Sequence, residues 1–105
     1  MISYIKKHLI KKTAEKLGMR PRELTPIVNA IFETLRDMMI GNNFEKECRI
    51  EIRNFGVFEV KRTAAKPKAR NPKKPDEVIY VPARRKTLFR PGKIMKDELR
   101  KPFDG

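Results

Sequence analysis

Residues 63–82 read Thr-Ala-Ala-Lys-Pro-Lys-Ala-Arg-Asn-Pro-Lys-Lys-Pro-Asp-Glu-Val-Ile-Tyr-Val-Pro. This stretch has too few apolar side chains to close a core, and its second half favours β-structure too strongly for a simple linker. Asn71-Pro72 marks a turn. Five basic residues surround that turn before the first acid, Asp76: Lys66, Lys68, Arg70, Lys73 and Lys74. We therefore expect a charged β-hairpin arm that suits a polyanion.

The positive charge of the chain is unevenly distributed. Over 105 residues, 26 Lys and Arg stand against 13 Asp and Glu, a net charge of +13. Residues 1–60 contain 11 basic and 8 acidic residues, net +3, whereas residues 61–105 contain 15 and 5, net +10. A basic second half favours a nucleic-acid partner, with an anionic membrane surface as the weaker alternative.

The length allows one domain, residues 1–105, with a small core. Without the arm about 85 residues remain, a size at which core burial barely offsets chain entropy, so we expect burial against a partner. Cys48 is the only cysteine, which excludes an intrachain disulfide and favours a reducing compartment. No apolar run approaches the roughly 18 residues of a membrane span, and residues 1–4 do not resemble a signal peptide. We expect a cytosolic protein.

Residues 4–17 predict a first helix. Apolar side chains recur there at helical spacing and lysines fill the other face, with Ser3 placed to cap the start and Gly18 to end it. His8 is the only histidine and has no cysteine nearby. We therefore expect a solvated helix position rather than a metal ligand or catalytic base, and no metal or cofactor.

Residues 21–40 predict a second helix, with an apolar face wider than one neighbouring helix needs. Pro26 complicates its start, because a proline inside a helix lacks the amide donor and clashes with the preceding turn. We therefore expect a short turn at residues 21–24 and a main helix capped by Thr25. Gly41-Asn42-Asn43 is the expected stop.

Residues 48–53 alternate strictly, with Cys48, Ile50 and Ile52 expected to face inward, which predicts a half-buried strand. Asn54-Phe55-Gly56 is the expected turn. Residues 57–62 return as a second strand that continues into the arm.

After the arm, residues 77–90 predict a third strand, in which Pro82 marks an edge position or a bulge. Residues 91–101 predict a short helix with Ile94, Met95 and Leu99 facing inward. The resulting order, two helices, two strands, an arm, a strand and a helix, belongs to the α+β class.

Three segments carry a family resemblance. They are Asn54-Phe55-Gly56-Val57-Phe58 at the sheet turn, Ala69-Arg70-Asn71-Pro72 at the arm tip, and Ala83-Arg84-Arg85 with Phe89-Arg90-Pro91-Gly92-Lys93 before the last helix. In this order and spacing they make the chain, from Tyr4 to Lys101, resemble the bacterial HU and integration host factor family of DNA-bending, histone-like proteins. The third segment is more similar to integration host factor. One residue more than usual between Pro72 and Gly92 predicts a bulge or a longer tip.

The resemblance implies an intertwined dimer, a homodimer with a heterodimer as the alternative. Each chain would contribute a helical dimerisation part (1–41), a three-stranded antiparallel sheet (48–62 and 77–90) with a protruding β-ribbon arm (63–82), and a C-terminal helix (91–101). The implied partner is double-stranded DNA, bound in the minor groove and favoured when bent or distorted. The implied function is sequence-tolerant bending and compaction of chromosomal DNA in the nucleoid.

By the same resemblance, Pro72 takes the place of an arm-tip proline that wedges between base pairs. A proline suits this task because its apolar ring has no amide proton, so it replaces a stacking face without burying an unsatisfied donor. A strand advances roughly 3.3 Å per residue, so the ten residues from Thr63 to Pro72 reach about 30 Å. The full set of residues expected to bind DNA is Arg62, Lys66, Lys68, Arg70, Asn71, Pro72, Lys73, Lys74, Arg84, Arg85, Lys86, Arg90 and Lys93.

Two other functions fit parts of the sequence. Residues 14–18 and the helix after them imitate a helix-turn-helix, and the arm would then be the wing of a winged-helix regulator. That interpretation needs a polar reading face on the second helix, whereas this one is mostly apolar. A ribosomal-type RNA-binding protein fits the charge and predicts a preference for RNA. An enzyme is disfavoured, because the acids are scattered among basic residues and no glycine-rich phosphate loop is present.

Overall fold

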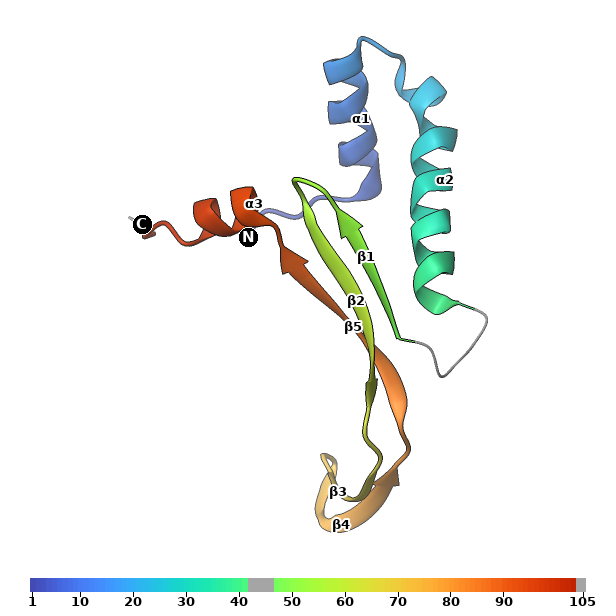
Figure 1. The fold of residues 1–105 in the computed structure, drawn as a ribbon, viewed down its shortest axis with the longest axis vertical. Helices are drawn as coiled ribbons and strands as arrows, with labels where there is room; N and C mark the ends of the chain where they lie inside the picture. The colour runs from blue at the N-terminus through green and yellow to red at the C-terminus, as the bar shows by residue number, and fades with distance from the viewer. Residues whose placement is uncertain (42–46, 104–105) are drawn as a thin grey trace. The chain divides into compact units, whose positions relative to one another are not determined.

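The computed structural model describes residues 1–41 and 47–103, and the chain divides into two compact units, Met1–Ile40 and Gly41–Gly105. The first unit contains two helices, and the second contains five strands and a short helix (Figure 1). In chain order the elements are α1 (Lys6–Leu17), α2 (Pro21–Ile40), β1 (Cys48–Ile52), β2 (Gly56–Thr63), β3 (Lys66–Asn71), β4 (Lys74–Val81), β5 (Arg84–Pro91) and α3 (Lys93–Leu99).

The helical unit has a small core. Ile10 and Ala14 of α1 pack against Leu24 and Val28 of α2, with Met19 partly buried beside them. Most of the remaining apolar face of α2 is exposed in the single chain, including Ile27, Ile31, Phe32, Met38 and Ile40. The wide apolar face predicted from the sequence is therefore present, and only part of it is covered within the chain.

Helix α1 ends as predicted but begins later. Gly18 adopts the left-handed conformation, with φ of 67°, and closes the helix. The predicted cap at Ser3 is wrong, because the N-cap is Ile5 and no side chain caps it with a hydroxyl. Instead, the backbone N–H of Ile5 donates to Nδ1 of His8 at 3.0 Å. His8 therefore fixes the helix start, a local role that its exposed position alone did not indicate.

Helix α2 is continuous from Pro21, so the predicted break and the Thr25 cap are wrong. Pro21 itself occupies the first helical position, where the missing amide donor costs nothing. Pro26 lies inside the helix and removes one main-chain donor near its start. The hydroxyl of Thr25 donates to the carbonyl of Pro21 at 2.8 Å, as in a helix interior. The helix ends at Ile40, and the predicted stop residues Asn42 and Asn43 lie outside the described residues.

Strands β1, β2 and β5 form an antiparallel sheet in that order, which confirms the predicted three-stranded sheet. The turn between β1 and β2 has Asn54 at φ 65°, and the N–H of Phe55 donates to the carbonyl of Ile52 at 3.0 Å. A positive φ at this position favours asparagine or glycine. The alternation of β1 is confirmed at Cys48 and Ile50, which are half-buried while Arg49 and Glu51 are exposed. Ile52 at the end of the strand is 38% exposed, so the inward position predicted for it is wrong within the single chain.

The predicted third strand over residues 77–90 is two strands, β4 and β5, separated by Pro82-Ala83. A proline removes a ladder donor, so the pairing changes at this point. Strand β4 pairs with β3 in a two-stranded ribbon, which is the predicted arm (Figure 1). The register shifts between Lys66 and Ala69, where the extra residue lies on β3, and again between Arg70 and Asn71, where the extra residues lie on β4. Only the second shift falls within Pro72–Gly92, where a bulge or a longer tip was predicted.

Helix α3 is shorter than the predicted 91–101 and packs on β5. Met95 is half-buried, but Ile94 and Leu99 are 63% and 72% exposed, so the inward orientation predicted for these two is wrong within the single chain. A seven-residue helix at the sheet edge has too few neighbours in one chain to cover both side chains. None of the helices in the described part of the chain is long and apolar enough to cross a membrane.

Candidate nucleic-acid interface

The strand register separates the sheet into an apolar face and a charged face. Phe58 lies between Ile50 and Phe89 on the apolar face, and the rings of Phe55, Phe58 and Phe89 pack with centroids 4.9–6.3 Å apart. Because side chains alternate along a strand, the neighbouring positions point to the other side. The charged residues on that side are Arg49, Glu51, Glu59, Lys61, Arg84, Lys86 and Arg90, with Val57, Thr63 and Leu88 among them, and we call it the charged face.

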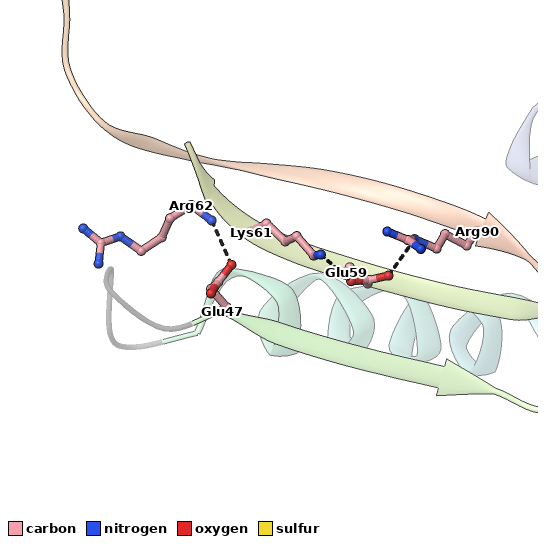
Figure 2. A network of polar contacts seen from close by, with 5 residues as sticks. All are labelled: Glu47, Glu59, Lys61, Arg62 and Arg90. Atoms are coloured by element: carbon pink, nitrogen blue, oxygen red, sulfur yellow. Dashed lines mark hydrogen bonds and ion pairs between the residues drawn. The ribbon is translucent and has the colours of Figure 1, made fainter. Parts of the chain in front are cut away.

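Glu59 lies in the middle of the charged face and organises its polar contacts (Figure 2). Its Oε1 forms an ion pair with Nε of Arg90 at 2.8 Å, and its Oε2 lies 3.4 Å from Nζ of Lys61. The Glu59 side chain is only 15% exposed, whereas those of Arg90 and Lys61 are 64% and 44% exposed. A largely covered carboxylate therefore anchors two basic side chains that remain open to solvent.

Two of the predicted DNA-binding residues lie on the opposite face at their register positions. Arg62 pairs with Arg85, one position out of phase with the charged face. The backbone N–H of Arg62 donates to Oε2 of Glu47 at 3.3 Å, and its exposed side chain extends away from that carboxylate (Figure 2). Arg85 is half-buried. Arg84, Lys86 and Arg90, in contrast, share the charged face.

The base of the arm is fastened by Thr63. Its hydroxyl donates to the carbonyl of Arg84 at 3.0 Å and accepts from the backbone N–H of Arg84 at 3.3 Å. This reciprocal pair lies where the β2–β5 ladder ends and the chain continues into the ribbon. Thr63 thus joins the two strands at the point from which the arm starts.

The tip of the arm is a two-residue turn, Pro72-Lys73, between the paired residues Asn71 and Lys74. The Asn71 side chain braces it: Oδ1 accepts from the backbone N–H of Lys73 at 3.0 Å, and Nδ2 donates to Oε2 of Glu77 at 3.4 Å. Asn71 is half-buried, and the other predicted tip and ribbon residues are exposed, namely Lys66, Lys68, Arg70, Pro72, Lys73 and Lys74. The predicted Asn71-Pro72 turn is therefore confirmed, with the proline ring at the end of a basic ribbon.

Comparison of the sequence with known proteins identifies the family to which the chain belongs. The family model described as bacterial DNA-binding protein matches residues 4–100. A prophage-derived DNA-binding protein HU 2 of Bacillus subtilis is 36% identical over 95 residues, which cover 90% of this chain and 96% of the relative. The chain belongs to the bacterial DNA-binding protein family, the HU family.

Further HU relatives agree in length and shape. DNA-binding protein HU of Geobacillus stearothermophilus is 33% identical over 95 residues, covering 90% of this chain and 98% of the relative. Among solved structures, an Anabaena HU in a cocrystal with DNA matches with a TM-score of 0.77 at 25% identity, over 94% of this chain and all of that chain. The resemblance to the HU family and the HU-like α+β fold are thereby confirmed.

The residues predicted from the HU resemblance fall into groups in the structure. The predicted residues from Lys66 to Lys74 lie on the ribbon and its tip, Arg84, Lys86 and Arg90 lie on the charged face, and Lys93 is exposed at the start of α3. The set of DNA-binding residues predicted from the sequence did not include Arg49 and Lys61, although both lie on the charged face. Their signal in the sequence was the period-two alternation, which places Lys61 rather than Arg62 in phase with Glu59.

Proposed function

We propose that this HU-family chain forms a dimer that binds double-stranded DNA with little sequence preference, bends it, and compacts the chromosome in the nucleoid. The observation that carries the proposal is the basic ribbon β3–β4, which ends in an exposed Pro72 braced by Asn71. No catalytic step is part of this function. The whole chain, residues 1–105, acts as one DNA-binding domain.

The exposed apolar face of α2 supports the dimer. Ile31 is 59% exposed, Met38 56% and Ile27 49%, although the same helix buries Leu24 and Val28. Large apolar side chains on one helix face gain free energy when a second surface removes them from water. A second copy of the chain would supply that surface, and residues 1–41 would be the dimerisation part.

The ribbon supports minor-groove binding. Its exposed lysines and Arg70 would neutralise phosphates on both sides of the groove, while the Pro72 ring would insert between base pairs from that groove. Unstacking one base step costs about a few kcal/mol in proteins that wedge apolar side chains from the minor groove, a class in which HU and integration host factor are standard examples, and the bend brings more DNA onto the protein. Flexible pyrimidine–purine steps and already distorted DNA should therefore be preferred.

The charged face of the sheet would hold the DNA backbone behind the arms. Arg84, Lys86 and Arg90 lie on it together, and Lys93 is exposed at the start of α3, whereas Arg62 and Arg85 lie on the opposite face of the sheet. Contacts to phosphates position a protein on the duplex without reading its sequence, which suits a sequence-tolerant function. A helix-turn-helix regulator is disfavoured because α2 is mainly apolar on the side such a protein would need for base contacts.

A binding competition tests this function. Gel shifts with linear, nicked and four-way-junction DNA, each with RNA as competitor, should show tighter binding to the distorted DNA and weak competition by RNA. Affinity for linear DNA should fall steeply with salt, by a log–log slope of about −0.9 for each phosphate neutralised. Preference for RNA, or affinity that hardly depends on salt, would contradict the proposal.

A further inference from the structure

Glu59 is an acid on a face that the proposed function assigns to a polyanion. A carboxylate there repels phosphates within a Debye length, about 8–10 Å at moderate salt. Its side chain is also 15% exposed, so it has lost much of its hydration. A contribution to folding does not account for it, because ion pairs whose basic partners are well exposed add little to stability.

The geometry of the two contacts gives a different reason. Arg90 uses Nε, the inner nitrogen of its guanidinium, to reach Glu59 at 2.8 Å. A guanidinium offers five N–H groups in a fixed plane, so this contact leaves its two terminal amino groups available to another acceptor. Lys61 reaches the other carboxylate oxygen at 3.4 Å and is 44% exposed.

We propose that Glu59 is a positioning residue for DNA binding, which holds Arg90 on β5 and Lys61 on β2 so that their outward N–H groups meet backbone phosphates. The inference rests on the proposed DNA-binding function. Each carboxylate oxygen holds one of the two cations, and Figure 2 shows Glu59 between them. Side chains fixed before binding lose less conformational freedom when the phosphate arrives.

Glu51 provides a matched control. It lies on the same charged face, opposite Val57, and it is exposed. Charge alone predicts that removal of either acid raises the affinity for DNA. A positioning role for Glu59 predicts that the two substitutions change the affinity for DNA differently. Glu59→Ala should lower the affinity by roughly three- to tenfold, whereas Glu51→Ala should leave it unchanged or raise it.

The measurement is a salt titration of affinity by fluorescence anisotropy on a short labelled duplex. In Glu59→Ala the log–log slope should become shallower by up to about two, since two phosphate contacts weaken. The slope of Glu51→Ala should match that of the wild type. Glu59→Gln keeps one oxygen for Arg90 but loses the oxygen that faces Lys61, so it should recover only part of the affinity lost in Glu59→Ala.

A second pair of variants leaves Glu59 in place. Arg90→Lys keeps the charge but cannot donate through an inner nitrogen while it presents two outer amino groups. Arg84→Lys makes the same exchange at a position on the same face whose side chain has no carboxylate partner among the described residues. Arg90→Lys should therefore weaken DNA binding several-fold more than Arg84→Lys does.

Two results would overturn the positioning role while leaving DNA binding intact. One is a Glu59→Ala variant that binds as tightly as the wild type or gains affinity as Glu51→Ala does. The other is equal loss in Arg90→Lys and Arg84→Lys. If the wild-type protein itself fails to bind DNA in a salt-dependent manner, the proposed function fails instead.

Discussion

At the scale of single residues, close packing between β2 and β5 requires glycine at position 56. A Cβ atom built on Gly56 would lie 2.6 Å from the carbonyl oxygen of Arg90 and 2.7 Å from the ring of Phe89. Neither the backbone of a paired strand nor a ring packed against Phe55 and Phe58 can easily move away. The glycine in the Asn54-Phe55-Gly56 motif is thus explained by contact rather than by backbone conformation.

We predict that Gly56→Ala lowers the free energy of unfolding by about 1–3 kcal/mol, the usual cost of overpacking. Gly18→Ala is the comparison, because φ there is 67° but a Cβ meets nothing within 4 Å. That substitution should cost only about 1 kcal/mol, from backbone strain. Both values come from urea unfolding monitored by circular dichroism. A Gly56→Ala variant as stable as the wild type would show that the sheet adjusts to the extra methyl group.

At the scale of elements, the arm depends on how its base is fastened. Thr63 exchanges two hydrogen bonds with Arg84 at the last pair of the β2–β5 ladder. Beyond this pair the chain continues through the ribbon, which is paired only with itself. A two-stranded ribbon is marginal alone, so its orientation depends on this junction.

Replacement of Thr63 by valine should loosen the arm without unfolding the sheet. We expect hydrogen exchange of the β3 and β4 amides to become roughly tenfold faster, the effect of losing about 1.4 kcal/mol locally. Thr87→Val is the control, since Thr87 lies on β5 opposite Val60 with its side chain exposed. Equal exchange in the two variants would show that the junction is held by the backbone ladder alone.

Most of the helices, strands and turns could be predicted from the sequence, because residues close together in the chain determine where they begin and end. Gly18 ended α1 and the turn at Asn54 was recognised, since both depend on conformations that few residues adopt. Pro26 misled the prediction because tertiary packing of Leu24 and Val28 keeps α2 continuous through the proline. Ser3 failed as a cap because His8 satisfies the donor at Ile5.

Sequence patterns predicted those parts of the interface whose residues lie close together in the chain. The ribbon lysines and Pro72 were found because a run of charge and a turn pair are visible in the chain. The pairing of Glu59 with Arg90 was not, since these residues are 31 positions apart and meet only through the strand register. The same register puts Lys61 in phase with Glu59 and Arg62 out of phase, a distinction that net charge does not make.

At the scale of the whole molecule, a single chain buries few apolar side chains and leaves many large ones exposed to solvent. Among the described residues, the buried apolar side chains are Ile10, Ala14, Leu24, Val28 and Val60. Ile94 and Leu99 of α3 are exposed as well, which fits a fold completed by a second copy. Stability and association should therefore be coupled.

We predict that sedimentation at micromolar concentration shows a dimer, and that thermal stability rises with protein concentration. Each tenfold increase in concentration should add about 1.4 kcal/mol to the free energy of unfolding, as expected when two unfolded chains form one folded dimer. Ile31→Glu should shift the protein toward unfolded monomer, because it places a charge in the apolar face of α2. A folded monomer with concentration-independent stability would exclude a shared core.

The central claim is that an apolar ring at the tip of a basic ribbon bends the double helix. Energy transfer between dyes at the two ends of a short duplex measures the bend, and anisotropy on the same duplex measures affinity. Pro72→Ala should reduce the bend by roughly half or more while Kd rises by less than about tenfold, because the basic residues that neutralise phosphates remain. Pro75→Ala, a proline within β4 rather than at the turn, should leave the bend intact. An unchanged bend in Pro72→Ala, or equal losses in both variants, would contradict the account.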